Sequence, residues 1–219
     1  MRSSGYQRSS GVWDRLVWIQ EELKRKVRIQ PLQRKVLLVA GCDCGIRQDQ
    51  GVGVVVVFKL PELEEVEYQY YQGRLTIPYR SGFLGFREVP LLIPAFQRLK
   101  HCPDLILVDG QDIAHPRNFG LACHLGVLIN QPTIGCAKSR LIGRYQEPGL
   151  KRGSYSSLYN GTKRIGYVLR TKDRVRCLFV SPGHCTDLQD ARRWTLRLAK
   201  PYRLPQVIRR AHHYARVLL

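Results

Sequence analysis

The sequence predicts an α/β fold in which a mixed β-sheet is flanked by helices on both faces. Short β-branched runs fill residues 35–60, a strand, a helix and a second strand follow one another over residues 104–138, and helical patterns stand near both ends of the chain. The strand-helix-strand unit implies parallel pairing, whereas strands joined by short turns pair antiparallel. The 219 residues suit one domain, which we place at residues 11–219 behind a basic tail at residues 1–10 that we expect to be disordered.

The first part of the chain supplies a helix and three consecutive strands. Apolar residues recur at helical spacing over residues 12–27. Residues 35–44 and 51–60 are apolar and β-branched with a turn-rich loop between them, so they predict a buried hairpin. Residues 64–75 alternate less regularly and are rich in glutamate, which suits a strand with one wet face at the edge of the sheet.

The middle of the chain supplies a second helix and the parallel unit. Residues 86–99 are helical in pattern although two prolines interrupt them. Residues 104–110 predict a fully buried strand, residues 119–130 a nearly all-apolar helix and residues 132–138 the next strand. This unit places two parallel strands beside each other in the sheet.

The last part of the chain predicts another hairpin and two helices. Residues 164–170 and 174–181 form the hairpin. Thr186 or Asp187 caps the helix that follows. The final helix spans residues 205–218, with a proline at its start.

The composition favours a polyanionic partner. The chain carries 36 Lys and Arg against 17 Asp and Glu, a net charge of +19. The basic residues concentrate in residues 137–176 and 191–216, which therefore predict surfaces that contact phosphates. A solvated surface tuned for solubility is the alternative.

The composition also excludes several classes of protein. No apolar run reaches the length of a membrane span, so we expect no membrane partner. The first ten residues lack the apolar segment of a signal peptide. The seven cysteines include no C-x-x-C pair, which predicts reduced thiols in a cytoplasmic protein rather than disulfides or a structural zinc site.

Two aspartates stand where predicted buried strands end. Asp43 closes the run VLLVAGCD and Asp109 closes LILVD. Neighbouring strands lie about 4.8 Å apart, so pairing of these two strands would bring both carboxylates to one edge of the sheet. Two such charges repel unless a cation intervenes, and Mg²⁺ is bound through carboxylates. Each aspartate alone is equally explained as the cap of a turn.

Three further residues are candidates for the same site. Glu88 lies at the start of a predicted helix, where an acid also suits the helix dipole. His212 shares the apolar face of the last helix, so we expect it to point inward, where it either bonds a core carbonyl or orients or ligates beside a metal. Lys138 follows a buried strand, and we expect an inward amine that needs an anion.

The motifs resemble those of the endonuclease V family. The matching segments cover roughly residues 36–218 in the family's order and spacing: AGCD, IPYRSGFLGFRE, LILVDGQDIAHPRNFGLACHLGV, PTIGCAKS, VSPGH and RRAHHY. The block from Asp109 to Ser139 is highly specific. The resemblance implies a ribonuclease H-like fold, Mg²⁺ or Mn²⁺ as cofactor and inosine-containing nucleic acid as substrate, with residues 11–219 as the catalytic domain.

The resemblance also implies roles for the candidate residues. It assigns metal-binding, catalytic carboxylates to Asp43, Glu88 and Asp109. It assigns a catalytic histidine to His212 and a phosphate-contacting lysine to Lys138.

The implied wedge and base pocket lie in separate segments. Pro78, Tyr79 and Arg80 fall where the family has a strand-separating wedge, and Tyr79 would stack into the gap that the lesion leaves. The residues that line the implied pocket for the flipped hypoxanthine are Gly82, Leu84, Gly110 and Gly120. Glycines let the backbone approach a flat base closely, although each is otherwise an ordinary turn or packing glycine.

Three positions depart from the family's pattern. Arg80 and Ser81 replace an apolar residue and a proline at the wedge, so we expect a cationic, less rigid tip that depends more on attraction to phosphate. Asp112 stands where glycine is usual, and we expect this acid to perturb metal affinity.

The activity that the resemblance implies is hydrolysis of the second phosphodiester bond 3′ to inosine in DNA. The products carry 3′-hydroxyl and 5′-phosphate ends, and we expect a monomer that acts in DNA repair. Three alternatives stay open: an inosine-specific ribonuclease on single-stranded RNA, a nucleic-acid-binding protein without catalysis, and, disfavoured by the charge, a metal-free structural protein.

Overall fold

The computed structural model describes residues 11–219, so the tail predicted at residues 1–10 lies outside the described residues. The strands of the described range are β1 (Leu38–Arg47), β2 (Gln50–Lys59), β3 (Glu64–Arg74), β4 (Leu105–Val108), β5 (Thr133–Ala137), β6 (Tyr155–Asn160), β7 (Lys163–Leu169) and β8 (Leu178–Pro182). The helices of the same range are α1 (Val12–Lys24), α2 (Leu84–Gln97), α3 (Leu121–Ile129), α4 (Leu188–Leu198) and α5 (Gln206–Val217).

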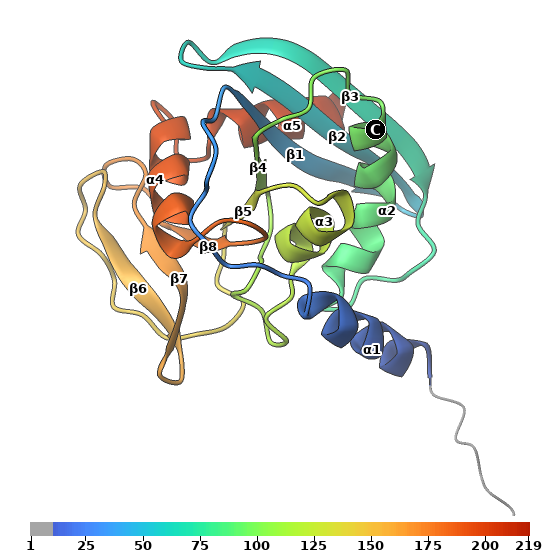
Figure 1. Ribbon diagram of the computed structural model, residues 1–219, viewed down its shortest axis with the longest axis horizontal. Coiled ribbons are helices and arrows are strands. Elements are labelled where there is room, and N and C mark those ends of the chain that lie inside the picture. Colours follow the sequence, from blue (N-terminus) through green and yellow to red (C-terminus); the bar gives the residue numbers. More distant parts are fainter. Residues whose placement is uncertain (1–10) are drawn as a thin grey trace, which may run out of the picture.

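The strands form one mixed sheet in the order β3-β2-β1-β4-β5-β8-β7-β6 (Figure 1). The predicted hairpins β1–β2 and β7–β8 pair antiparallel, and β3 lies at an edge of the sheet, as its glutamate-rich sequence predicts. At the centre, β1, β4 and β5 run parallel to one another. The predicted fold class is therefore confirmed, and the parallel centre sets the edge at which loops leave the sheet.

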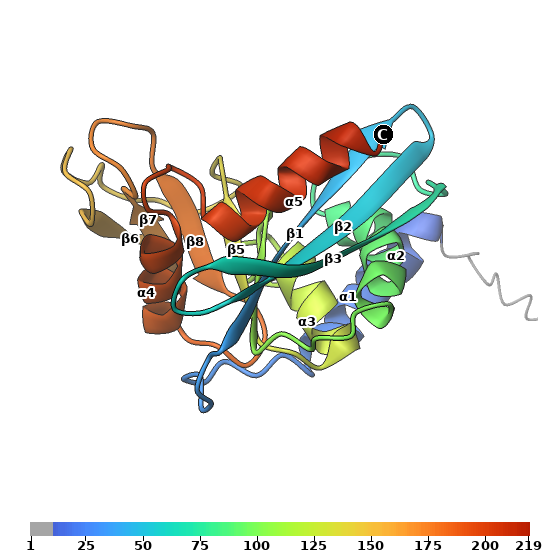
Figure 2. The ribbon, with the colours of Figure 1, turned by 90° about the horizontal axis from the view of Figure 1, so that it is seen from above.

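Both faces of the sheet are covered by helices (Figure 2). One core cluster packs α4 and α5 against the sheet, and the other packs α2 and α3 against the opposite face. The valine run of β2 shows why both layers are needed: Val54 and Val56 belong to the first cluster, while Val55 and Val57 belong to the second. A strand buried on both sides reads as a continuous apolar run.

The structure differs from the sequence predictions at three elements. β6 was not predicted, because its sequence YSSLYN is polar and only Leu158 is buried. β1 continues past the expected end to Arg47, since it pairs with β2 along its whole length. α2 begins at Leu84, earlier than the apolar pattern suggested, and both prolines lie inside it.

The structure describes all seven cysteines and the helices of residues 11–219. All seven cysteines are free, and Cys42, Cys123, Cys136 and Cys177 are buried. Within residues 11–219, the structure contains no helix with the length and apolar character needed to span a bilayer.

Candidate active site

Parallel pairing of β1 and β4 brings Asp43 and Asp109 together. The two strands are in register with Cys42 opposite Val108, so each aspartate is the next residue on a neighbouring strand. The Asp109 N–H faces the Cys42 carbonyl oxygen at 3.4 Å. The expectation that Asp43 ends its strand is wrong, because β1 runs on to Arg47. Of the two strands, only β4 ends at this point, so the loop that follows β4 forms the opening of the site.

A glycine on each side of Asp43 lets α5 pack directly on β1. A Cβ at Gly41 would lie 2.2 Å from the carbonyl carbon of Val207, and a Cβ at Gly45 would lie 2.4 Å from the Ala215 oxygen. Alternate residues of a strand face the same side, so Asp43 faces α5 between these two contacts. The segment GCDCG thus provides the space in which the helix meets the carboxylate.

His212 of α5 hydrogen-bonds to Asp43. Its Nδ1 lies 2.7 Å from Asp43 Oδ2. The expected inward position is wrong, since the His212 side chain is 46% exposed while Ala211 and Ala215 are fully buried. His212 lies at the margin of the apolar face, where the ring reaches the carboxylate and still meets solvent.

Asp43, Asp109 and His212 form a potential metal site. Among residues 11–219, one ligand atom of each lies within 4.8 Å of the others. Burial raises the pKa of Asp43 and Asp109 raises it further, whereas the hydrogen bond with His212 lowers it. A divalent cation would relieve the repulsion between the carboxylates, and carboxylate oxygens with an imidazole nitrogen are suitable ligands. The residues therefore fit a divalent metal ion.

Glu88 approaches this cluster from α2 without belonging to it. Burial, followed by the charges of Asp43 and Asp109, raises the pKa of Glu88 to about 8. Because α2 begins at Leu84, Glu88 lies in the second turn, so the helix-dipole alternative does not apply. Its carboxyl group is within electrostatic range of both aspartates.

Lys138 lies beside Asp109, directly after the neighbouring parallel strand. It follows β5, and its ammonium group forms an ion pair with Asp109 Oδ2. The expected inward position is wrong, because the Lys138 side chain is 41% exposed. An amine at the rim stays accessible to an anion.

A cavity of about 290 Å³ opens beside the carboxylates. The predicted residues that line it are Tyr79, Gly82, Leu84, Asp109, Gly110, Gly120 and Lys138. Pro78 and Arg80 are not among its lining residues. Sequence reasoning missed the contribution of Gln20 from α1, which no motif marks, and of His115, which stands unremarked in the quoted segment AHPR.

Two glycines of the cavity also serve the packing of its own loop. A Cβ at Gly120 would lie 2.5 Å from the Gln111 carbonyl oxygen, and one at Gly110 would lie 3.0 Å from Leu121 Cδ2. A larger residue at Gly120 would therefore displace the backbone of the loop as well as fill the cavity.

Asp112 was expected to act near the metal cluster, but it does not belong to that cluster. Its side chain is fully buried, and Oδ2 accepts a hydrogen bond from the Gly135 N–H at 2.6 Å. Burial raises the pKa of Asp112 well above its ordinary value, in spite of this and other backbone hydrogen bonds. Asp112 therefore ties the loop after β4 to β5.

The wedge segment is held against α1. The Arg80 guanidinium lies 4.7 Å from the ring centroid of Trp13, and Arg80 stays exposed, so the cationic tip expected from the sequence rests on α1. Tyr79 is 70% exposed. Tyr79 is therefore the residue of this segment that is free to stack on a base.

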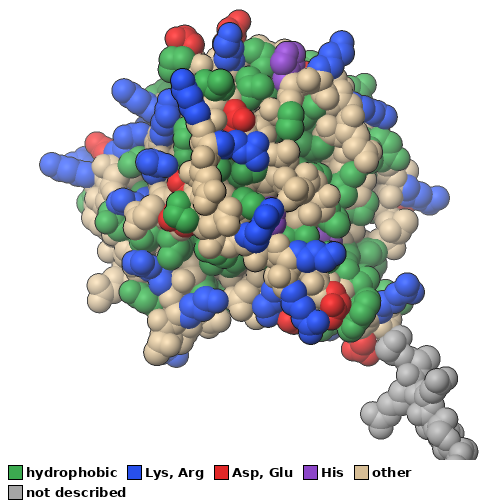
Figure 3. All heavy atoms as spheres, viewed as in Figure 1, with side chains coloured by type: hydrophobic (Ala, Val, Ile, Leu, Met, Phe, Trp, Pro, Cys, Tyr) green, Lys and Arg blue, Asp and Glu red, His purple; other side chains and the backbone are tan. Residues whose placement is uncertain are grey.

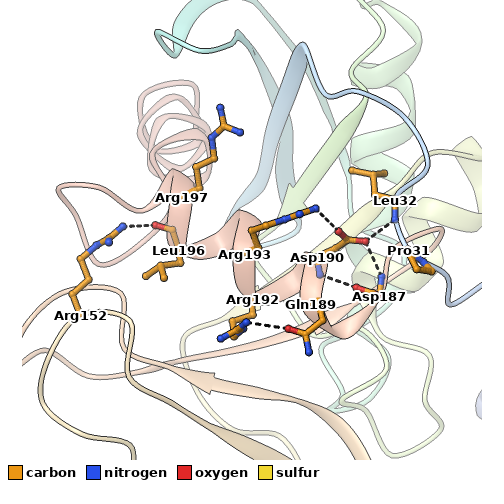
Figure 4. A pocket seen from close by; sticks show the side chains of 10 residues that line it. All are labelled: Pro31, Leu32, Arg152, Asp187, Gln189, Asp190, Arg192, Arg193, Leu196 and Arg197. Carbon is orange, nitrogen blue, oxygen red and sulfur yellow. Dashed lines mark hydrogen bonds and ion pairs between the residues drawn. The ribbon is translucent and has the colours of Figure 1, made fainter.

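A larger depression, of about 690 Å³, lies on α4 (Figure 4). The residues drawn there include the four arginines Arg152, Arg192, Arg193 and Arg197. Asp190 is already occupied, because it pairs with Arg193 at 3.0 Å and accepts the Leu32 N–H at 2.7 Å. β8 runs antiparallel to β5. The end of β8 from which the chain continues into α4 therefore lies at the opposite end of the strands from Asp109. We name this depression the α4 groove.

Comparisons with known proteins agree with the site. The family model described as Endonuclease V matches residues 21–213. "Endonuclease V" of Geotalea uraniireducens is 46% identical over 90% of this chain and 84% of its own length. The chain belongs to the endonuclease V family.

Solved endonuclease V structures share the fold. The crystal structure of Endonuclease V from Streptomyces avermitilis has a TM-score of 0.89 and 38% identity, covering 94% of this chain and 92% of its own. Endonuclease V from Ciona intestinalis, solved with a 24mer DNA containing an inosine followed by a ribo-adenosine, has a TM-score of 0.83 and 29% identity, covering 93% and 96%. The fold is ribonuclease H-like, and the family acts as endonucleases.

Proposed function

We propose that the chain is a metal-dependent endonuclease that recognises inosine in DNA and hydrolyses the second phosphodiester bond on its 3′ side. The products carry 3′-hydroxyl and 5′-phosphate ends. One observation carries the proposal: Asp109 belongs both to the cluster with Asp43 and His212 and to the lining of the cavity. Family membership supports it, as does the inosine in the DNA bound by the Ciona relative.

The metal-binding residues in this proposal are Asp43, Asp109 and His212, with Glu88 as a ligand or as the residue that holds water. Mg²⁺ or Mn²⁺, when bound, would activate a water and neutralise charge on the phosphate. His212 orients Asp43 through its Nδ1 contact. Lys138, at the rim beside Asp109, contacts a phosphate oxygen of the substrate.

Base selection in this proposal takes place in the cavity. A flipped hypoxanthine enters between the segments that carry Gly82 and Gly120, and Tyr79 stacks in the gap left in the strand. Hypoxanthine pairs weakly, so extracting it costs less than extracting a well-paired base.

The rest of the nucleic acid meets the basic surface. Lys and Arg side chains are spread over the face in Figure 3, where acids are few. A net charge of +19 supports long-range attraction of a polyanion.

We further propose that the protein acts as a monomer in the cytoplasm. Its free thiols support the cytoplasmic location.

The test is incubation with Mg²⁺ and a duplex that contains one deoxyinosine, with the position of the nick read by electrophoresis. His212→Ala should raise the Mg²⁺ concentration needed for half-maximal rate by about 10- to 100-fold, because a residue that orients or supplies a ligand is lost. His213→Ala is the matched control, since the neighbouring exposed ring lies outside the cluster. Cleavage without a divalent ion, or equal effects of the two changes, would contradict the proposal.

A second substrate is favoured by the altered wedge. Ser81 replaces the family's second proline and Arg80 is held on Trp13, which leaves fewer groups to force strands apart. A substrate that is already single-stranded, such as inosine-containing RNA, needs no wedge. Matched inosine oligonucleotides of single-stranded RNA, single-stranded DNA and duplex DNA would rank the substrates by kcat/KM.

A further inference from the structure

The carbonyl oxygen of Gly82 meets donors from three side chains. Gln20 Nε2 lies 3.0 Å from it, His115 Nε2 3.1 Å and Arg117 Nη2 2.5 Å. A backbone carbonyl has two lone pairs, so three donors saturate it. Gln20 comes from α1, whereas His115 and Arg117 come from the loop after β4, so two distant segments meet on one peptide group.

The chemistry of this network fixes the role of each atom. Gly82 O can only accept, so His115 carries its proton on Nε2, and its Nδ1 accepts the Arg117 N–H at 3.2 Å. Burial, and the charge of Arg117, lower the pKa of His115 to about 4, so the ring is neutral at pH 7 as this assignment requires.

Gln20 joins the members of this network. Its Nε2 bonds to the carbonyls of Gly82 and Phe119, and its Oε1 accepts from Arg117 Nε. The residue is only 2% exposed. Its polar atoms are thus occupied within the protein, and it acts on the cavity through Gly82.

Gly82 stands at a tight turn between the wedge and the cavity. The Phe83 N–H donates to the Arg80 carbonyl at 3.0 Å, and Gly82 has a φ of 81°. Positive φ at the third residue of the turn, with Ser81 at the second position outside the positive-φ region, defines a type II turn, which favours glycine or asparagine at the third residue. Because Tyr79 precedes this turn and Leu84 follows it, the orientation of the Gly82 peptide sets one wall of the cavity.

Aromatic contacts hold the same turn on α1. The rings of Trp13 and Phe83 meet edge to face with centroids 5.1 Å apart. Arg80 lies over Trp13, and Arg117 lies 4.4 Å over Phe83. The turn is therefore held by hydrogen bonds to its backbone and by the contacts of its two flanking side chains, Arg80 and Phe83.

We propose that α1 clamps the base pocket and that Gln20 is a positioning residue for base selection. This rests on the proposed function, because it assigns the cavity to hypoxanthine. Gln20 holds the Gly82 wall at the width that a flat purine needs. The metal cluster is built on β1, β4 and α5, so loss of the clamp should loosen base binding and leave the chemical step intact.

Gln20→Met tests the clamp, because it keeps the length of the side chain and removes its hydrogen bonds. With a single-stranded inosine oligonucleotide, we expect KM to rise about tenfold, as for the loss of one buried polar contact, with kcat unchanged. The preference for inosine over a matched adenosine oligonucleotide should fall by a similar factor. Gln33→Met is the matched control, since that exposed glutamine forms none of these contacts.

A second variant tests the clamp independently in case Gln20→Met fails to fold. Arg117→Lys keeps a charge but cannot bond to Gly82 and Gln20 together, so it should raise KM in the same way. The two changes act through one carbonyl, so the double variant should lose less than the product of the two single effects. Thermal unfolding of each variant identifies the folded fraction, and a folded Arg117→Lys with unchanged KM overturns the clamp.

The remaining outcomes separate the clamp from the function on which it rests. Wild-type protein that cleaves inosine and adenosine oligonucleotides equally overturns the proposed function. Wild-type preference that survives Gln20→Met with the same KM overturns the clamp alone. An equal loss of kcat on both oligonucleotides also overturns it, because that is the result of a merely structural role.

Discussion

At the scale of single residues, Asp112 is a buried carboxyl group with a pKa well above its ordinary value of 3.8. Above that pH the unfolded chain loses the proton and the folded protein keeps it. The folded state then binds more protons, so the free energy of unfolding falls as pH rises, by at most about 1.4 kcal/mol per pH unit. Asp112→Asn mimics the protonated form and should make the decline between pH 5 and 8 shallower than in the wild type.

Chemical denaturation of both proteins across that range measures the effect. The Gly135 N–H keeps its acceptor in the variant, so the two proteins should have similar stability near pH 5. Parallel stability curves would mean that Asp112 is ionised in the folded protein. The same result would restore the expectation that Asp112 acts as an additional negative charge near the metal site.

Residue types and spacing predicted that Asp43 and Asp109 would lie side by side, because the buried strands that carry or precede them are visible in the sequence. Asp109 follows a run of apolar residues, and parallel pairing then places it beside Asp43. The exposure of His212 was not predictable, since a helical period gives the face of a residue but not where that face ends. The exposure of Lys138 was not predictable either, because a residue directly after a buried strand can lie inside the protein or at the rim. Gln20 was invisible because its role depends on the docking of α1 against a loop distant in sequence.

At the scale of elements, the glycines of β1 decide whether α5 can deliver His212. Gly41→Ala would place a methyl group 2.2 Å from the Val207 backbone, so α5 must move away from the strand. Overpacking of this kind costs about 1 to 3 kcal/mol, and we expect a corresponding loss of unfolding free energy. The His212 contact with Asp43 should lengthen. The Mg²⁺ concentration needed for half-maximal rate should therefore rise, as we expect for His212→Ala.

Gly11→Ala is the control for this prediction. The nearest atom to a Cβ at Gly11 is Asp14 Oδ2 at 3.8 Å, an ordinary contact. We expect little change in either stability or metal requirement. If Gly41→Ala also left both quantities unchanged, the close approach of α5 to β1 would not be what positions the histidine.

The elements that sequence predicted well are those whose burial is regular. The valine run of β2 and the apolar strand β4 each specify a strand buried on both faces. β6 carries no such signal, because its place in the sheet comes from pairing with β7 rather than from an apolar face. The start of α2 was missed because its N-cap residue, Phe83, is not a capping residue type and forms no side-chain cap hydrogen bond.

At the scale of the whole molecule, the positive charge forms a distinct feature on α4. The α4 groove is lined by four arginines, Arg152, Arg192, Arg193 and Arg197, against two acids, Asp187 and Asp190, and Asp190 pairs with Arg193. The Arg192 guanidinium lies 4.2 Å from the ring centroid of Tyr155, and its Nη2 donates to Gln189 Oε1 at 3.1 Å. We expect this groove to bind the phosphate backbone of a substrate long enough to extend beyond the catalytic edge.

The triple variant Arg192→Glu, Arg193→Glu and Arg197→Glu should weaken binding of a long inosine oligonucleotide. Loss of three phosphate contacts should reduce the slope of log affinity against log salt by about 2 for a single strand. Binding and cleavage of a short oligonucleotide that covers only the cavity and the scissile bond should be unchanged. Fluorescence anisotropy over a salt series measures both lengths.

Net charge alone would weaken binding in any charge-reversed variant, so the control must change the charge equally outside the groove. Lys35→Glu, Lys59→Glu and Lys100→Glu meet this requirement, because all three side chains are exposed and none lines the α4 groove. Non-specific attraction predicts the same loss for both triple variants, at both lengths. A local binding surface predicts a loss of affinity that is confined to the arginine variant and to the long oligonucleotide, because only direct phosphate contacts release counterions at that place.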